Sequence, residues 1–265
     1  MAKLKTKEDL LKDLTKANHA RKAVLANRAG FNSVDEYRKH LQNSDSSLEA
    51  LSTSKPKIHI VNILDVSSSM DGGKFDKAFE GIKNEIKEFS TDVNTDYTAT
   101  FVSFSYGNKI IRHYFNTPIV DVKTPSLYAS GMTALNQAVG ETLEGLLKLD
   151  NNGVKTIVSI FTDGGENASG GKYGSNQAVA EIIKEAEKAG ITVTFIGTTN
   201  DTRDVINNFK IQVSNTLVHD NTAKGIEMSF KTKLGATRSY SANVSRGASN
   251  EELLTGFYSK TTGKL

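Results

Sequence analysis

Short apolar runs alternate with longer segments of helical periodicity after residue 57, and this alternation predicts the main domain of the chain. Runs of strand length lie at 58–64, 98–104, 109–115, 156–162, 191–197 and 216–219. Between them, apolar residues recur every three or four positions, which predicts helices over 75–89, 133–147, 176–189, 204–209 and 222–239. Runs 58–64 and 156–162 are mostly apolar, as is typical of central strands that are covered on both faces. We therefore expect an α/β fold with a doubly wound, mostly parallel sheet.

The two ends of the chain follow other patterns. Helical spacing over 6–28, followed by Ser33 and Glu36 in a capping-box arrangement, predicts a helical hairpin over residues 1–41. Residues 42–57 are rich in Ser and contain Pro56, which is typical of a linker. This places the main domain at 58–240. Residues 241–265 form a tail with a short helical pattern near 251–258, and we expect a packing or docking appendage there.

Composition excludes several classes of function. The chain has 265 residues, of which 37% are hydrophobic and 24% charged, enough to bury a sizeable core. It has no Cys, so disulfides, thiolate metal centres and a thiol nucleophile are excluded, and any metal needs oxygen or imidazole ligands. A charged N-terminal segment and the lack of a long apolar run predict neither secretion nor membrane insertion. We expect a cytoplasmic protein, or one that belongs to a phage particle assembled in the cytoplasm.

Positive charge is concentrated at one end of the chain. The formal net charge is +3, and residues 1–28 alone carry +5, which leaves −2 for the remainder. The basic segment is either a solvated amphipathic helix or an arm that contacts nucleic acid or an acidic protein surface. It lacks interleaved aromatic residues, which favours the first interpretation.

Oxygen-bearing side chains gather where two of the predicted central strands end. Run 58–64 leads into Asp65-Val66-Ser67-Ser68-Ser69-Met70, and run 156–162 leads into Asp163-Gly164-Gly165. Ser130-Gly131-Met132-Thr133 comes before the helix that connects to the second of these strands. Ligands of open parallel sheets bind beyond the carboxyl ends of the strands, so these loops form the candidate site.

Five short side chains of these loops could hold one metal ion: Asp65, Ser67, Ser69, Thr133 and Asp163. Alternate positions of an Asp-x-Ser-x-Ser loop can aim three oxygens at one point, and the other two residues could complete the set directly or through water. Small hard cations prefer oxygen ligands. Two carboxylates and three hydroxyls do not over-neutralise a dication, which therefore remains a Lewis acid for a carboxylate of a partner.

These loops resemble the metal-ion-dependent adhesion site of the von Willebrand factor type A domain. The resemblance rests on Asp65-Val66-Ser67-Ser68-Ser69-Met70, Gly131-Met132-Thr133 and Phe161-Thr162-Asp163-Gly164, and it covers roughly residues 57–240. It implies a six-stranded doubly wound sheet and a divalent ion, usually Mg²⁺ with Mn²⁺ or Ca²⁺ as alternatives, completed by an acidic group of a bound protein. The motif would assign ligands to the first loop (Asp65, Ser67, Ser69), the second (Thr133) and the third (Asp163).

The basic hairpin and the C-terminal tail have no place in this family pattern. With no signal peptide recognised, the chain is similar to stand-alone bacterial and phage members of the family. The sequence does not choose between these two settings.

Other residues of the loops are expected to face the partner: Met70, Asp71, Gly131, Met132, Gly164 and Glu166. The two acidic residues among them have an alternative interpretation as solvated loop charges. The Gly-rich segment 164–174 is either a mobile specificity loop or a flexible connection.

The candidate ligands also have simpler interpretations. Asp65 and the serines that follow could cap the next helix, Thr133 could be a helix N-cap, and Asp163 could begin a plain turn. Taken together, the three loops favour the metal site over these separate roles.

Motifs of other functions are missing from the sequence. No phosphate-binding glycine fingerprint and no nucleophile elbow occur, and the five histidines are scattered without metal-ligand spacing. We therefore expect a non-enzymatic, divalent-metal-dependent protein interaction module that binds an acidic group. The alternatives are a structural subunit of a bacterial or phage assembly that docks by its terminal appendages, and a nucleic-acid-associated protein that uses the basic arm. A further alternative is metal-assisted hydrolysis through Asp163 or Glu166.

Overall fold

The computed structural model describes residues 26, 33–43, 55–105, 109–149 and 153–259. In this part of the chain one sheet contains six strands, β1 (Lys57–Asp65), β2 (Asp96–Ser105), β3 (Lys109–Pro118), β4 (Val154–Phe161), β5 (Ile191–Gly197) and β6 (Thr216–Val218). Their order is β3-β2-β1-β4-β5-β6. All neighbours pair in parallel except β2 and β3, which are antiparallel. The predicted α/β fold with a mostly parallel six-stranded sheet is confirmed.

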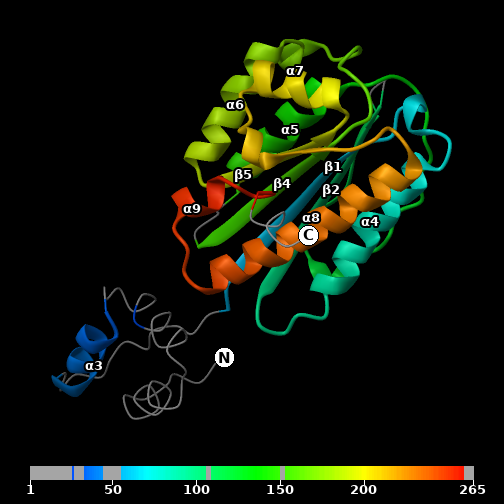
Figure 1. The fold of residues 1–265 in the computed structure, drawn as a ribbon. Coiled ribbons are helices and arrows are strands. Elements are labelled where there is room, and N and C mark those ends of the chain that lie inside the picture. The colour runs from blue at the N-terminus through cyan, green and yellow to red at the C-terminus, as the bar shows by residue number, and fades with distance from the viewer. Residues whose placement is uncertain (1–25, 27–32, 44–54, 106–108, 150–152, 260–265) are drawn as a thin grey trace.

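Helices cover both faces of the sheet (Figure 1). On one face lie α4 (Lys74–Phe89), α8 (Ala223–Ser245) and the short α9 (Asn250–Leu254). The other face carries α5 (Leu135–Leu147), α6 (Asn176–Lys188) and α7 (Thr199–Phe209). Single turns of 3-10 helix occur in the connections, at η1 (Ser68–Met70), η2 (Ile119–Asp121), η3 (Gly171–Tyr173) and η4 (Val213–Asn215).

Strand β1 contributes to both halves of the core, which explains why its sequence is mostly apolar without a regular alternation. Successive side chains of a strand point to opposite faces of the sheet. Ile60 and Leu64 pack in the cluster beneath α4 and α8, whereas Val61 and Ile63 pack in the cluster beneath α5 and α6. The central position of β1, between β2 and β4, places its last residue in the middle of the sheet edge.

Strand β3 is longer than predicted. The expected run ended at residue 115, but pairing with β2 continues until Pro118 lies opposite Thr98. The register shifts along this pair, and Asn116 adopts φ 45° within it. An extra residue in one strand of an antiparallel pair interrupts the alternation that sequence patterns rely on.

Helix α3 (Val34–Asn43) lies where the second helix of the predicted hairpin was expected. Ser33 caps it, because its Oγ accepts a hydrogen bond of 3.1 Å from the backbone N–H of Glu36. The first predicted helix, over 6–28, lies outside the described residues except for residue 26, as do residues 44–54 of the expected linker. Among the described helices, none has the length and apolar character that crossing a membrane requires.

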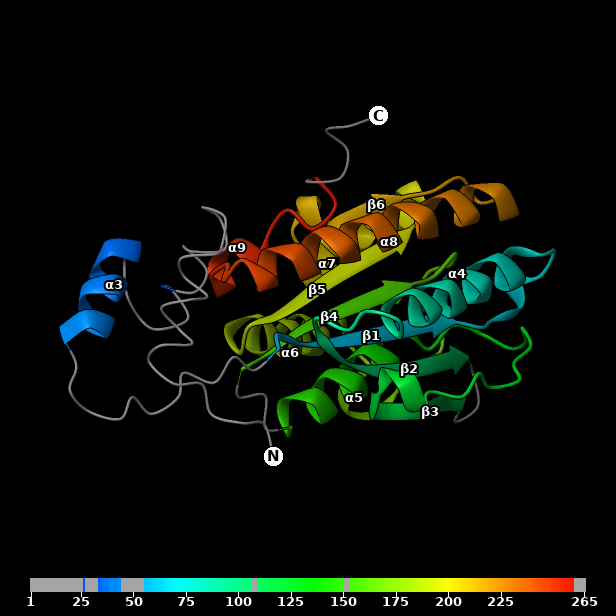
Figure 2. The ribbon, with the colours of Figure 1, turned by 90° about the horizontal axis from the view of Figure 1, so that it is seen from below.

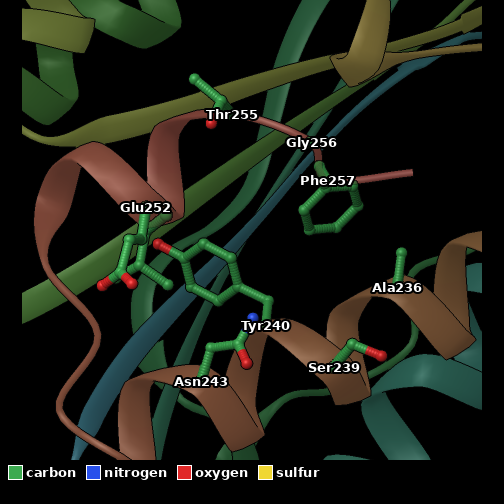
Figure 3. A pocket seen from close by; sticks show the side chains of 9 residues that line it. Ala236, Ser239, Tyr240, Asn243, Glu252, Thr255, Gly256 and Phe257 are labelled. Carbon is green, nitrogen blue, oxygen red and sulfur yellow. The ribbon is translucent and has the colours of Figure 1, made fainter. Parts of the chain in front are cut away.

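The C-terminal segment packs as part of the domain, and α8 runs past the expected boundary at residue 240. Leu253, Phe257 and Tyr258 are buried in the same cluster as α4 and α8. Figure 3 shows Tyr240 of α8 facing the segment that carries Glu252 and Phe257. The pocket between them has a volume of about 10 Å³, room for a single water molecule. Burial of large aromatic side chains explains why this segment is held against the sheet.

Candidate metal centre

Three loops meet at the edge of the sheet where β1 and β4 end (Figure 2). The first loop follows Asp65, the second precedes α5, and the third follows β4. Two backbone hydrogen bonds join the first loop to the second, from Ser68 N to the carbonyl of Gly131 at 2.9 Å and from Ser130 N to the carbonyl of Val66 at 2.7 Å. The candidate site is therefore built on loops that are fixed to one another.

A continuous row of hydrogen bonds connects four of the five candidate ligands. Oδ1 of Asp65 accepts from the backbone N–H of Ser67 at 2.7 Å, and the hydroxyls of Ser67 and Ser69 lie 2.9 Å apart. The Ser69 hydroxyl donates to Oδ1 of Asp163 at 2.6 Å. Residues 94 positions apart in the chain thus place their oxygens in direct contact.

The fifth candidate ligand, Thr133, lies beside Gly164. A Cβ built on this glycine would lie 3.5 Å from Oγ of Ser69 and 3.7 Å from Oγ1 of Thr133, so both hydroxyls flank the same residue. Thr133 is held by its backbone, which donates to Oδ1 of Asn167 at 2.9 Å and accepts from the N–H of Asn167 at 3.1 Å. All five predicted residues therefore come together in one place.

The environment of Asp65 disfavours its charged form. Burial of Asp65 raises the pKa of its carboxyl group to about 6, and the negative charge of Asp163 acts in the same direction. Hydrogen bonds from Thr162 and Ser67 to Asp65 lower the pKa, but they do not offset the loss of hydration. A buried carboxylate with a second one nearby is an environment that favours a bound cation.

The donor set fits a hard dication. In the residues that the structure describes, no group of three or more His, Asp or Glu side chains could hold a metal ion. The cluster instead combines two carboxylates with three hydroxyls, an all-oxygen set of the kind that Mg²⁺, Mn²⁺ and Ca²⁺ accept. Hydroxyl ligands add no charge, so a dication held here would keep part of its own.

The simpler role of these side chains as helix caps is wrong. Helix α4 begins after Gly73 and α5 begins after Ala134, and neither start has a side-chain cap at its N-cap position. Ser67 precedes η1, and its side chain makes no capping hydrogen bond there either. The hydroxyl of Thr133 therefore does not cap α5.

Glu166 is not the solvated loop charge of the alternative interpretation, because backbone amides hold its carboxylate. Its Oε2 accepts from the backbone N–H of Asn136 in the first turn of α5 at 2.7 Å. Its Oε1 accepts from the N–H groups of Ala168 and Ser169, at 2.7 and 2.6 Å. A carboxylate at a helix N-terminus satisfies free amides and interacts favourably with the helix dipole. Glu166 thus fixes the third loop to the start of α5.

The residues expected to face a partner differ in exposure, and Gly164 is half-buried. Met70 is fully buried, at 0% exposure, because η1 turns its side chain into the core under α4, so the prediction for this residue is wrong. Met132 is 44% exposed, and Asp71 and Gly131 are exposed as well. Gly131 adopts φ 83°, a conformation that glycine reaches without strain.

The Gly-rich segment 164–174 is anchored near its end. Tyr173 is buried, its ring lies against Gly140 of α5, and its hydroxyl donates to Oε2 of Glu144 at 3.0 Å. Together with the contacts of Glu166, this attaches the segment to α5 on both sides of the exposed Gly170 and Gly171.

Two polar residues beside the cluster were not found by sequence reasoning. Lys74, in the first turn of α4, forms an ion pair with Oδ2 of Asp163 and donates to Oδ1 of Asn221 at 3.1 Å. The signal available was weak: Lys74 follows the first loop closely, and Asn221 follows β6, so both lie at the same edge of the sheet.

The sequence model of the von Willebrand factor type A domain family matches residues 59–225, which is more than half of the chain. The chain belongs to this family. The match confirms the resemblance, and all three loops of the domain's candidate site lie within the matched range. No curated protein matches the sequence.

Solved structures of a pilus adhesin and of a minor pilin share the fold. The pilus adhesin SpaC of Lactobacillus rhamnosus GG, in an open conformation, has a TM-score of 0.54 and 16% identity, over 69% of this chain and 30% of its own. The PilB minor pilin of Streptococcus sanguinis has a TM-score of 0.50 and 13% identity, over 74% of this chain and 63% of its own. At these identities, the likeness shows the fold alone.

A mussel byssus protein is also similar. Proximal thread matrix protein 1, in a structure with a zinc-occupied MIDAS motif, has a TM-score of 0.47 and 20% identity, over 68% of this chain and 48% of its own. This chain spans about half the length of the mussel protein's structures.

Proposed function

We propose that this von Willebrand factor type A domain is a non-enzymatic, divalent-metal-dependent module that binds an acidic group of a partner protein. The observation that carries the proposal is the row of hydrogen bonds from Asp65 through Ser67 and Ser69 to Asp163, with the hydroxyl of Thr133 beside Gly164. The metal ligands would be Asp65, Ser67, Ser69, Thr133 and Asp163. Mg²⁺ is the proposed ion, with Mn²⁺ and Ca²⁺ as alternatives.

The role of each of the five residues in the metal site follows from its charge and burial. The carboxylates of Asp65 and Asp163 would supply the negative charge, and the three hydroxyls would fill positions without adding to it. A bound dication would supply a Lewis acid that attracts a carboxylate of the partner. Exposed Asp71, Gly131 and Met132, together with Gly164 and Glu166 of the third loop, would contact the rest of the partner.

Calorimetric titration with Mg²⁺ and with Mn²⁺ tests the metal site. We expect the unmodified protein to bind one ion, and Asp65→Asn and Asp163→Asn to bind none. Asp71→Asn is the matched control, because it removes an exposed carboxylate of the same loop, and it should bind as the unmodified protein does. Equal binding by all four proteins would contradict the proposed ligands.

The acidic partner is tested with the immobilised protein. Proteins retained from the native source in Mg²⁺ should be released by a chelator, and Asp163→Asn should not retain them. Partners that stay bound in chelator and bind Asp163→Asn equally would refute metal-bridged recognition and favour docking by the terminal segments.

A further inference from the structure

Lys74 connects the start of α4 to the third loop of the site. Its ammonium group forms an ion pair with Oδ2 of Asp163, while Oδ1 of the same carboxylate accepts from Ser69. The Lys74 side chain is only 16% exposed, and that of Asp163 is fully buried. A second acceptor, Oδ1 of Asn221 in the loop before α8, lies 3.1 Å from the ammonium and holds it in position.

This arrangement gives Asp163 a cationic partner from within the chain. Water and salt screen a charge at a partly buried position less than a charge on the surface. The ammonium group of Lys74 therefore repels a second cation strongly. A divalent ion that uses Asp163 must either displace the ammonium or bind with the ammonium still beside it. Both routes make metal binding less favourable and lower the affinity of the site for the ion.

We propose that Lys74 competes with the divalent ion for Asp163 and thereby sets the metal affinity of the site. This inference rests on the proposed function, since it concerns the same carboxylate. Lys74 is not part of the family motif, and its role opposes that of the ligands because it weakens metal binding. The ion then binds only where the metal concentration is high enough, or where a carboxylate of the partner adds enough affinity, to overcome this competition.

The opposite role for Lys74 would be to hold Asp163 in the right orientation for the metal. The two roles differ in sign. If Lys74 competes, removing its charge raises the affinity for the metal. If Lys74 orients Asp163, removing it lowers the affinity, because the carboxylate must then be ordered when the ion binds.

Lys77 provides a matched control on the same helix. It lies one turn after Lys74 in α4, and its ammonium contacts Glu80 at 3.3 Å and Glu227 at 3.4 Å, not Asp163. Lys77→Met therefore removes the same charge from the same helix without touching the candidate ligands. Lys74→Arg keeps the charge at the site itself, and Lys74→Gln is a second neutral variant in case Lys74→Met fails to fold.

The test is calorimetric titration of these proteins with Mn²⁺ after removal of bound metal. We expect Lys74→Met and Lys74→Gln to bind Mn²⁺ about tenfold more tightly than the unmodified protein. Lys74→Arg and Lys77→Met should bind like the unmodified protein. Thermal unfolding gives a second readout, because the stabilisation by Mn²⁺ should be larger in the neutral Lys74 variants.

Three outcomes would overturn the proposal, and they can be told apart. Unchanged or weaker Mn²⁺ binding by both neutral variants refutes competition by Lys74 while leaving the metal site itself intact. An equal gain in Lys77→Met would show a general effect of net charge instead of a contact with Asp163. Absence of binding by every protein, the unmodified one included, would remove the proposed function together with the inference.

Discussion

Lys233 of α8 forms an ion pair with Glu85 of α4, and both side chains are only 2% exposed. The carboxylate also accepts from Nδ2 of Asn62 at 3.0 Å and from the hydroxyl of Thr237 at 3.0 Å. The pair therefore ties both helices to central strand β1 through a network in which several polar groups satisfy one another. A buried pair of this kind is costly to break from one side, because the remaining charge is left without a partner.

Lys233→Met should lower the free energy of unfolding by ~3–5 kcal/mol, because it leaves the charge of Glu85 buried. The double variant Lys233→Met with Glu85→Gln should lose less than Lys233→Met alone, since no unpaired charge remains. Urea denaturation of both proteins measures the difference.

The exposed ion pair of Arg238 and Glu88 joins the same two helices and is the matched control. Its side chains are 57% and 33% exposed. Arg238→Met should change the free energy of unfolding by less than ~1 kcal/mol. If Lys233→Met costs no more than Arg238→Met, the buried pair has no special role in stability.

Asp65→Asn should separate stability from metal binding. Burial raises the pKa of Asp65 to about 6 from its ordinary value of 3.8. At pH 7 the charged carboxylate is therefore less favourable in the folded protein than in the unfolded chain. Asn accepts the hydrogen bond of Ser67 without this charge, and the variant should be more stable than the unmodified protein in chelator, by up to ~3 kcal/mol. In saturating Mg²⁺ the order should reverse, because only the unmodified protein gains from the ion.

The pH dependence of the same comparison follows from the direction of the shift. The folded protein binds the proton of Asp65 more tightly than the unfolded chain does, so the advantage of Asp65→Asn should shrink as the pH falls through 6 towards 3.8. Unfolding in chelator at several pH values measures it. An advantage that is constant with pH, or absent at pH 7, would contradict the assigned burial cost.

Sequence patterns predicted the sheet and the five clustered oxygens because both depend on local features. Strand and helix periodicity are properties of neighbouring residues, and parallel topology then brings strand ends to one edge. This is why the first and third loops could be placed together. They are far apart in the chain: 94 positions separate Ser69 of the first loop from Asp163 of the third.

The features that sequence patterns did not predict depend on single contacts between distant elements. Met70 follows a hydrophilic motif, and only the turn of η1 sends its side chain into the core. Glu166 reaches an amide 30 residues earlier in the chain, and Lys74 reaches a carboxylate 89 residues later. Neither residue belongs to a periodic pattern, so the sequence alone does not distinguish such contacts from solvated charges.

Glu166→Ala should loosen the third loop and the first turn of α5. The substitution removes the acceptor of the N–H groups of Asn136, Ala168 and Ser169. The loss of a charged group that caps a helix should cost ~1–2 kcal/mol of stability. Amide hydrogen exchange should become faster at these three residues in particular.

Glu141→Ala tests whether that effect is specific. Glu141 is exposed on α5 and accepts from the side chain of Gln137 at 2.8 Å, so it has no contact with the loop backbone in the described residues. Its loss should leave amide exchange of the third loop unchanged. Similar exchange in both variants would show that the contacts of Glu166 do not hold the loop.

His59 should make the protein less stable in mild acid. The ring is buried in β1, where its Nε2 lies 2.8 Å from the hydroxyl of Thr100, and burial lowers its pKa to about 4 from the ordinary 6.5. The unfolded chain therefore takes up a proton at a higher pH than the folded protein does. The neutral ring favours folding fully above pH 6.5, and up to ~3 kcal/mol is lost as the pH falls to 4.

The comparison of the unmodified protein with His59→Gln isolates this effect from the opposite contribution of Asp65, which both proteins share. Gln keeps a polar group near Thr100 but does not titrate in this range. In chelator, the free energy of unfolding of the unmodified protein should decrease relative to that of His59→Gln between pH 6.5 and 4. A difference that stays constant over this range would mean that His59 takes up its proton equally well in the folded protein, and hence that its burial in β1 carries no cost for the charged ring.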